Sequence, residues 1–361
     1  MKLTLILLFL LLSQVSGELF TIGATFLAGA VISYFYSNSD SFGDQAKSLV
    51  CKSGVAYYGD KYIECCNDPW VEPDISGLRY DLENYLFGQH IAKEMIPSAI
   101  AASRKEISPS KPLVMSFHGW PGNGKNYVAS FIAKNYFQHG ADSNYFHLFS
   151  GRKDFSVERD VNLYKRQLSN WVRGNVTLCK YSVFVFDEVD KMPFQVLDIL
   201  KPFLDHHNHY QRVDYRRSIF IFLSNTGGNL ITERYLELWR KYGKSREQMT
   251  LNDFDSVIGR GAFNEEGGLQ KSELIEHNLI DHYIPFLPLE KSHVEMCIKA
   301  ELDKHGFGHK KEIFDEVMQV VTFGPKPENL FSSAGCKRVS QQVATIVERE
   351  RFRSRYRSKE L

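Results

Sequence analysis

The chain of 361 residues is long enough to bury a substantial core, and its 43% hydrophobic and 24% charged residues are typical of a globular protein. Its 44 lysines and arginines nearly balance 43 aspartates and glutamates, which gives a net charge of +1. This balance excludes a general basic field for nucleic acid, so no nucleic-acid partner is expected. The most basic run, RERFRSRYRSK at 349–359, is better interpreted as a solvated helix end than as a binding arm.

Two apolar runs open the chain. Lys2, the run LTLILLFLLL and the small residues Val15 and Gly17 form the pattern of a secretory signal peptide cleaved after Gly17, and the run is too short for a spanning anchor. The second run, LFTIGATFLAGAVISYFY at 19–36, carries no charge. It predicts membrane association, while a true span, a segment lying in one leaflet and a buried helix stay open as alternatives.

The cysteines and a glycosylation motif agree with a secretory location. Adjacent Cys65 and Cys66 rarely pair with each other, and the order of the cysteines leaves the other pairings open. The tripeptide Asn175-Val176-Thr177 is an acceptor for N-glycosylation at Asn175. The cysteines available for disulfides are Cys51, Cys65, Cys66, Cys179, Cys297 and Cys336.

Three short apolar runs follow a helical pattern that begins near Asp81: LVMSF (113–117), SVFVF (182–186) and SIFIFLS (218–224). Each run is continuous rather than alternating, as expected of strands covered on both faces of a parallel sheet. Helical patterns separate the runs, so the sequence predicts an α/β fold with a doubly wound parallel sheet. We expect IPFLPLE (284–290), with its two prolines, to be a linker, and residues 291–350 to form a smaller helical domain.

A phosphate-binding loop is the strongest functional signal. Residues 119–126, GWPGNGKN, lie between the first apolar run and a helical pattern, and seven of these eight positions fit G-x-x-x-x-G-K-[ST]. Glycines let backbone N–H groups turn toward phosphate, and Lys125 would reach the β- and γ-phosphates. The exception is Asn126, whose amide replaces a hydroxyl. The residues predicted to bind ATP are Gly119, Trp120, Pro121, Gly122, Asn123, Gly124, Lys125, Asn126 and Tyr127.

Polar residues end the second and third apolar runs, at the sheet edge where ligands bind in such folds. In VFVFDE (183–188), Asp187 is expected to hold Mg²⁺ and Glu188 to polarise the attacking water; taken alone, the pair would equally suit a cap on a neighbouring helix. Asn225 is expected to orient the lytic water. Asn126 offers Mg²⁺ only a carbonyl oxygen, a weaker and bulkier ligand than a hydroxyl, so we expect metal placement and hydrolysis to be handicapped.

Together with LFGQH (86–90), WVRGN (171–175), FDEVDKM (186–192), LIDHYIPFLPLE (279–290) and GCK (335–337), these motifs resemble those of the torsins, the lumenal branch of the Clp-related AAA+ ATPases. The resemblance extends from near residue 75 to near residue 340. It implies an AAA+ P-loop fold, ATP and Mg²⁺ as cofactors, oligomerisation, and chaperone-like protein remodelling in the lumen of the endoplasmic reticulum and nuclear envelope. Torsins have Asn at the position of Asn126, whereas Pro121 departs from the family, which usually has Thr there.

The resemblance also implies that a partner completes the catalytic site. Clp relatives carry, at the position of Leu279, an arginine that reaches into the neighbouring subunit's site, an effect worth about a thousandfold or more in rate. Leucine supplies none of this effect, and Arg260 is a poorly aligned substitute. The torsin resemblance implies membrane-anchored lumenal activators whose domains are similar to an AAA+ subunit and supply an arginine. We therefore expect slow hydrolysis until such an activator binds.

The motif GCK implies further site residues. By resemblance Lys337 is the second sensor of the γ-phosphate, although Clp relatives have arginine there and lysine lacks its planar fork. By the same resemblance Cys336 pairs with Cys297 and couples lumenal redox state to nucleotide contacts, the alternative being two small buried residues. The interval 150–167 lacks the aromatic loop with which Clp unfoldases grip polypeptide, so remodelling is expected rather than threading.

Two other functions stay open. An ATP-gated scaffold with negligible hydrolysis is favoured by Asn126 and Leu279 but opposed by Glu188, and a small-molecule kinase is disfavoured by the acidic pair and the helical C-terminal domain. The cluster DHHNH (205–209) is interpreted as a solvated helix end rather than a zinc site. The predicted organisation is a signal peptide (1–17), a hydrophobic membrane-associated segment (18–37), a Cys-containing lumenal segment (38–75), a large AAA+ nucleotide-binding domain (76–287) and a small helical AAA+ domain (288–361).

Overall fold

The structure is a computed structural model that describes residues 51, 64–206, 209–308 and 310–357. The chain divides into two compact units, Met1–Glu72 and Pro73–Leu361. The predicted signal peptide and the apolar run at 19–36 lie outside the described residues. Within the part of the chain that the structure describes, no helix combines the length and apolarity needed to cross a membrane.

The first unit contains a disulfide between Cys51 and Cys65. Cys65 therefore does not pair with its neighbour Cys66, as the sequence predicts. None of the cysteines is free.

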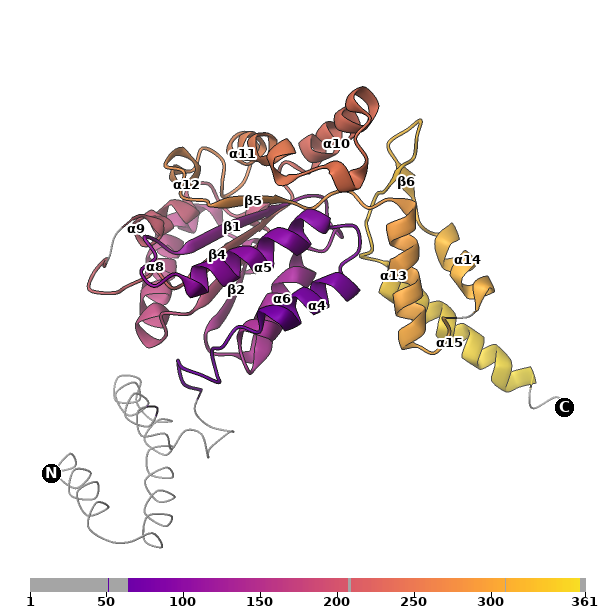
Figure 1. The fold of residues 1–361 in the computed structure, drawn as a ribbon, viewed down its shortest axis with the longest axis horizontal. Coiled ribbons are helices and arrows are strands. Elements are labelled where there is room, and N and C mark those ends of the chain that lie inside the picture. Colours follow the sequence, from indigo (N-terminus) through magenta and orange to yellow (C-terminus); the bar gives the residue numbers. More distant parts are fainter. Residues whose placement is uncertain (1–50, 52–63, 207–208, 309, 358–361) are drawn as a thin grey trace, which may run out of the picture. The chain divides into compact units, whose positions relative to one another are not determined.

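A five-stranded parallel sheet forms the centre of the second unit, with the strand order β2-β3-β4-β1-β5 (Figure 1). The non-sequential order places β1 and β3 on either side of β4. The carboxyl ends of these three neighbouring strands therefore meet at one edge of the sheet. The strands are β1 (Leu113–His118), β2 (Phe146–Ser150), β3 (Val183–Asp187), β4 (Ile219–Ser224) and β5 (His282–Pro285).

Helices cover the sheet, and every residue of β1 and β4 is buried. Burial on both faces explains why these runs are continuously apolar. The helices of this part are α4 (Ile75–Tyr85), α5 (His90–Lys105), α6 (Lys125–Tyr136), α7 (Gly151–Asp154), α8 (Val161–Leu178), α9 (Lys201–Leu204), α10 (Gly228–Tyr242), α11 (Asp255–Asn264) and α12 (Glu273–Glu276).

One face of the sheet is filled by stacked aromatic rings that run across the strands. Phe184 and Phe220 stack with ring centroids 4.9 Å apart, and Phe186 and Phe222 stack at 5.3 Å. Such cross-strand aromatic pairs stabilise a sheet beyond the apolar area that they bury. They hold β3 and β4 in a fixed register, which places the polar residues at the ends of these strands.

The three predicted strands are confirmed as β1, β3 and β4, but the two edge strands, β2 and β5, are not among the predicted ones. β2 was not anticipated because only one of its residues, His147, is buried, and Leu148 is 59% exposed. The expectation of a linker at 284–290 is wrong at its beginning, because β5 reaches Pro285 and pairs with β1. An edge position tolerates this proline, since a missing N–H on the outer side breaks no ladder bond.

The C-terminal part is helical, as predicted, and has its own apolar core. Three helices contribute to this core, which includes Val294 and Ile298 of the first helix, Val317 of the second and Val343 of the third. A two-stranded antiparallel hairpin, which the sequence did not suggest, lies between the second and third helices. The elements are α13 (Lys291–Lys304), α14 (Lys311–Gln319), β6 (Phe323–Gly324), β7 (Phe331–Ser332) and α15 (Val339–Arg357).

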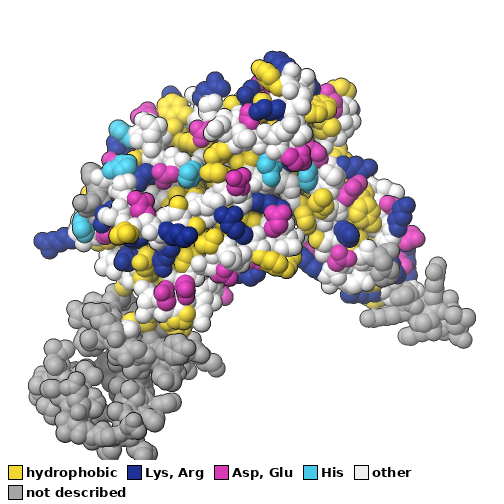
Figure 2. Space-filling model, in the orientation of Figure 1, with side chains coloured by type: hydrophobic (Ala, Val, Ile, Leu, Met, Phe, Trp, Pro, Cys, Tyr) yellow, Lys and Arg dark blue, Asp and Glu magenta, His cyan; other side chains and the backbone are white. Residues whose placement is uncertain are grey.

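The surface carries charges of both signs. On the face shown in Figure 2, lysine and arginine side chains are interspersed with aspartate and glutamate. This distribution agrees with the near balance of charge in the sequence.

Candidate nucleotide-binding site

The phosphate loop connects β1 to α6, as the sequence predicts. Gly119 has φ 150° and Gly122 has φ 84°, backbone angles that residues with a side chain rarely adopt. A Cβ on Gly119 would lie 2.3 Å from the carbonyl oxygen of Phe286, and one on Gly122 would lie 2.0 Å from that of Ala334. Glycine is therefore required at both positions, because other backbone packs directly against the loop.

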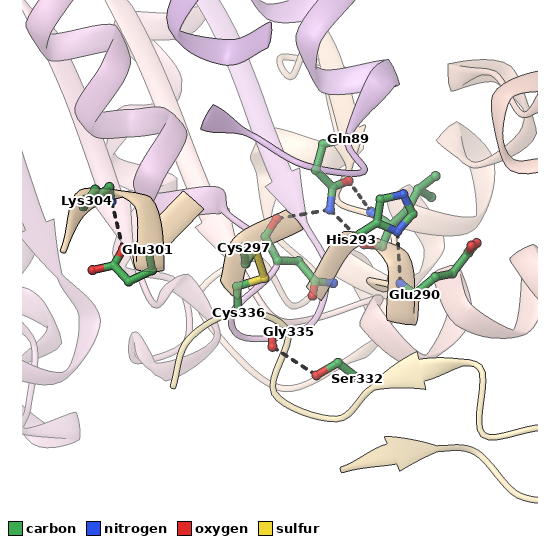
Figure 3. Close-up of a disulfide and its surroundings, with 11 residues drawn as sticks. Gln89, Glu290, His293, Cys297, Glu301, Lys304, Ser332, Gly335 and Cys336 are labelled. Atoms are coloured by element: carbon green, nitrogen blue, oxygen red, sulfur yellow. Dashed lines mark hydrogen bonds and ion pairs between the residues drawn. A yellow bond between two sulfur atoms is a disulfide. The ribbon is translucent and has the colours of Figure 1, made fainter. Parts of the chain in front are cut away.

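Gln89 supports the loop from the segment that precedes α5. Its Nε2 donates to the carbonyl oxygens of Asn123 at 3.1 Å and Leu287 at 2.9 Å, and its Oε1 accepts from the Leu287 N–H at 2.8 Å. Gln89 is buried, so these bonds are shielded from water. One side chain thus joins the phosphate loop to the chain that leaves β5 (Figure 3).

Lys125 is the first residue of α6, and only 7% of it is exposed. Its Nζ donates to the carbonyl oxygens of Gly119 and Trp120 and, at 3.1 Å, to Oδ1 of Asn225. Burial lowers the pKa of Lys125 to about 8, and the carboxylates of Asp190 and Asp187 oppose that shift. The ammonium group is thus held over the loop by three oxygens that a phosphate would replace.

Asn126 and Asp187 are in contact. The Nδ2 of Asn126 donates to Oδ2 of Asp187 at 2.5 Å, which leaves the Asn126 carbonyl oxygen as its atom able to face a cation. Carboxylate and carbonyl oxygens are ligands that suit Mg²⁺, so these two residues fit the predicted ion. Within the described residues no group of three or more His, Cys, Asp or Glu side chains could hold a metal, so phosphate and water oxygens would complete the coordination.

Glu188 has a left-handed backbone conformation, with φ 52°, at the start of a 3₁₀ turn. Its carboxylate forms an ion pair with Nε of Arg152 at 3.0 Å and accepts from the hydroxyl of Ser150 at 3.4 Å. A Cβ on Gly151 would lie 2.3 Å from the Glu188 carbonyl oxygen, so the two segments are closely packed. Sequence reasoning missed Ser150 and Arg152, because it missed the strand β2 that brings them here.

Lys337 lies beside the phosphate loop, in the segment that precedes α15. The backbone N–H of Cys336 donates to the carbonyl oxygen of Gly122 at 3.1 Å. Cys336 and Cys297 form the disulfide that the family resemblance implied (Figure 3). The C-terminal part is therefore fixed to the phosphate loop by a backbone hydrogen bond next to a covalent link to α13.

These groups line one cavity of about 550 Å³, a size suited to a nucleotide. Of the predicted site residues, it contains Pro121 to Tyr127, Asp187, Glu188, Asn225, Lys337 and the cysteine pair. Gly119 and Trp120 do not line it, and their carbonyl groups bind Lys125 instead. The lining that sequence reasoning missed comprises Tyr85, Leu86, Phe87, Leu223, Leu289, Ala300, Glu301, Lys304, Val339 and Ser340.

Other predicted residues lie away from the cavity. Leu279 is 2% exposed in the main core, and Arg260 lies exposed on α11 and does not line the cavity. Asn175 lies within α8, where its Nδ2 donates to the Trp171 carbonyl oxygen at 2.8 Å, and glycosylation there stays a prediction. The histidine cluster at 205–209 includes residues 207 and 208, which lie outside the described residues.

Comparisons with known proteins identify relatives of this chain. A model of the family named Torsin matches residues 60–186, and one named Torsin-1A, C-terminal domain, matches residues 289–344. The Torsin-like protein of Caenorhabditis elegans is 40% identical over 309 residues, which are 83% of this chain and 86% of that protein.

Solved structures of Hsp104 are similar in fold. The S. cerevisiae Hsp104–ADP complex has a TM-score of 0.53 at 16% identity, covering 87% of this chain and 53% of that chain. The closed state of Hsp104 with ATPγS and FITC casein has a TM-score of 0.53 at 16% identity, covering 84% and 50%. The chain thus spans about half the length of the Hsp104 chains that it matches.

The parallel sheet, the phosphate-loop motif after β1 and the acidic pair at the end of β3 define an α/β fold of the AAA+ class, which the likeness to Hsp104 supports. A helical C-terminal part completes this architecture. Within that class, the chain belongs to the torsin family.

Proposed function

We propose that this protein is an ATPase that remodels other proteins from the lumen of the endoplasmic reticulum and nuclear envelope. One observation carries the proposal: a single cavity contains the phosphate loop, both carboxylates of the acidic pair, Asn225 and Lys337. These are the groups that binding and hydrolysis of ATP require, and they come from three strand ends and the C-terminal part.

The residues divide the chemistry between them. Lys125 leaves the loop carbonyls to bind the β- and γ-phosphates, while Asp187 and Asn126 would hold Mg²⁺, which would neutralise phosphate charge. Glu188 accepts a proton from the attacking water, which Asn225 orients. Lys337, which lines the same cavity, would contact the γ-phosphate. Glu188 needs its carboxylate for this step, so the ion pair with Arg152 has to open first.

The proposed enzyme is slow by itself. Asn126 takes the place of the usual hydroxyl ligand. The position of Leu279 carries no arginine and is buried, and Arg260 does not line the cavity. We infer that a membrane-anchored lumenal activator with an AAA+-like domain supplies this arginine within a mixed oligomer. The predicted signal peptide and apolar run support a lumenal, membrane-associated location, and protection of the protein from protease in sealed microsomes would test it.

Turnover of ATP by the purified protein tests the proposal, with and without detergent-extracted nuclear-envelope membrane proteins. Glu188→Gln provides the background, because it retains the shape of the side chain but removes the base. We expect the extract to stimulate hydrolysis by the native protein and not by the variant. Equal turnover by both proteins would count against the ATPase function.

An ATP-gated scaffold is the second candidate, and one observation favours it. The Glu188 carboxylate forms an ion pair with Arg152 and accepts a hydrogen bond from Ser150, so these contacts have to break before it can act as a base. A scaffold would bind ATP, hydrolyse none of it in either condition, and assemble equally well with Glu188→Gln. Sedimentation of both proteins with ATP distinguishes this function from the ATPase.

A further inference from the structure

Asp190 is a buried carboxylate to which no role in the site has yet been given. It lies in the 3₁₀ turn Val189–Lys191 that follows Glu188, and its side chain is only 8% exposed. It does not line the cavity. A buried charge is costly unless it is satisfied by hydrogen bonds, so its partners identify its function.

Those partners belong mainly to Asn225, the residue after β4. Oδ1 of Asp190 accepts from the backbone N–H of Asn225 at 3.1 Å and from its Nδ2 at 3.2 Å. Oδ2 of Asp190 lies 3.4 Å from the same Nδ2. The exposed ammonium of Lys191 contacts Oδ2 at 3.3 Å, so it balances charge without reaching Asn225.

The two neighbours of the Asn225 amide determine its orientation. An ionised carboxylate can only accept hydrogen bonds, and an ammonium group can only donate them. Asp190 therefore binds the Asn225 NH₂, and Lys125 donates to its Oδ1 at 3.1 Å. A flipped amide would place oxygen against carboxylate and NH₂ against ammonium, which are two unfavourable contacts. The carbonyl end of Asn225 thus faces the phosphate loop.

The position of Asp190 is itself fixed by close backbone packing. The N–H of Gly268 donates to the Val189 carbonyl oxygen at 2.9 Å. Gly267 has φ 139°, and a Cβ there would lie 2.7 Å from Cα of Asp190. Since backbone rather than a flexible side chain presses on this turn, Asp190 provides a rigid support for Asn225.

We propose that Asp190 is a positioning residue that fixes the Asn225 amide with its carbonyl oxygen toward the reacting phosphate. When Lys125 moves to the phosphates, this oxygen becomes free to accept a hydrogen bond from the attacking water. That water then donates a hydrogen bond to the Asn225 carbonyl oxygen through one of its protons and transfers the other proton to the Glu188 carboxylate. Asn225 acts as an acceptor for water in this arrangement, and not as a donor to the γ-phosphate. The inference rests on the proposed hydrolysis of ATP.

Single-turnover hydrolysis of radiolabelled ATP, with the full-length protein in excess, measures the effect without an activator. We expect Asp190→Ala to slow hydrolysis about ten- to hundredfold, the range for loss of a bond to a charged group, and to leave the ATP dissociation constant within about twofold. Because Asp190 acts through Asn225, the double variant Asp190→Ala/Asn225→Ala should be no slower than Asn225→Ala alone.

Asp198→Ala is the matched control. Asp198 is a carboxylate of the next 3₁₀ turn, which accepts from the Ser272 hydroxyl at 2.7 Å and the Glu273 N–H at 3.1 Å, outside the cavity. Its removal should leave the rate of hydrolysis unchanged. Additive losses in the double variant, or a loss of ATP binding that equals the loss of rate in Asp190→Ala, would overturn the proposal.

A second measurement separates this inference from the proposed function. In ¹⁵N-labelled protein without nucleotide, the Asn225 NH₂ protons should exchange slowly with solvent and become fast in Asp190→Ala. Slow exchange in a protein whose turnover does not exceed that of Glu188→Gln would support the orientation of Asn225 and reject the ATPase. If the Asn225 NH₂ protons exchange equally fast in the native protein and in Asp190→Ala, the positioning role of Asp190 is rejected, whatever the rate of ATP turnover.

Discussion

The two sides of the cavity are built in different ways. The phosphate side consists of contiguous motifs at the ends of β1, β3 and β4, and its contacts include part-buried hydrogen bonds that join Asn225 to Lys125 and to Asp190. The opposite side is formed by residues from the end of α4, from α13 and from the start of α15, including exposed ion pairs such as Lys304 with Glu301. The side predicted to bind phosphate is thus assembled from local motifs, whereas the rest of the pocket depends on how separate segments pack.

Removal of Lys125 is expected to have the largest effect on nucleotide binding. Lys125→Ala deletes a buried cation that is surrounded by oxygen acceptors, so we expect the ATP dissociation constant to rise about a hundredfold. Isothermal titration calorimetry measures this change. An affinity within about threefold of the native value would contradict this prediction, because most of the binding energy would then come from the α13 side of the cavity.

A change of pH is also expected to alter nucleotide binding through Lys125. Since burial lowers the pKa of Lys125 to about 8, the ammonium is present below that pH and is lost as pH rises through it. ATP affinity should therefore fall with increasing pH, approaching about tenfold per unit well above pH 8. Titrations with ATPγS from about pH 7 to pH 9.5 would show it.

Lys125→Arg is the control for this experiment, because arginine stays charged over the whole range. Its affinity should be independent of pH, even if it is weaker than that of the native protein. If the ATP affinity of the native protein is likewise independent of pH, the Lys125 ammonium is not the group that loses its proton.

The smallest effect is expected on the other side of the cavity. Lys304 lines the pocket from α13, is 59% exposed and pairs with Glu301 at 2.9 Å. Exposed pairs of this kind contribute about 0–1 kcal/mol, so Lys304→Ala should change ATP affinity by less than about threefold. A loss comparable with that of Lys125→Ala would mean that both sides bind phosphate.

The same difference decides what the sequence could reveal. Central strands such as β3 are covered on both faces and read as apolar runs, so their polar ends, Asp187 and Glu188, could be assigned in advance. β2 lies at an edge and carries the exposed Leu148, so its strand character was hidden. The residues at its end, Ser150 and Arg152, were hidden with it.

Asp190 shows a different limit. It stands in the motif FDEVDKM, yet its spacing alone gives no role, because its contact with Asn225 depends on the left-handed turn at Glu188 and on the packing of Gly267. Tyr85, Leu86 and Lys304 likewise enter the cavity only through tertiary packing. Local motifs predict which chemistry is present, whereas the supporting residues require the fold.

The hydrogen bond from the Cys336 N–H to the Gly122 carbonyl oxygen attaches the C-terminal part directly to the phosphate loop. The carbonyl group of Ala334 rests where a side chain on Gly122 would stand, so this attachment lies directly at the turn predicted to receive phosphate. Because this contact is backbone against backbone, a side chain at Gly122 would have to displace the segment that carries Cys336 and Lys337.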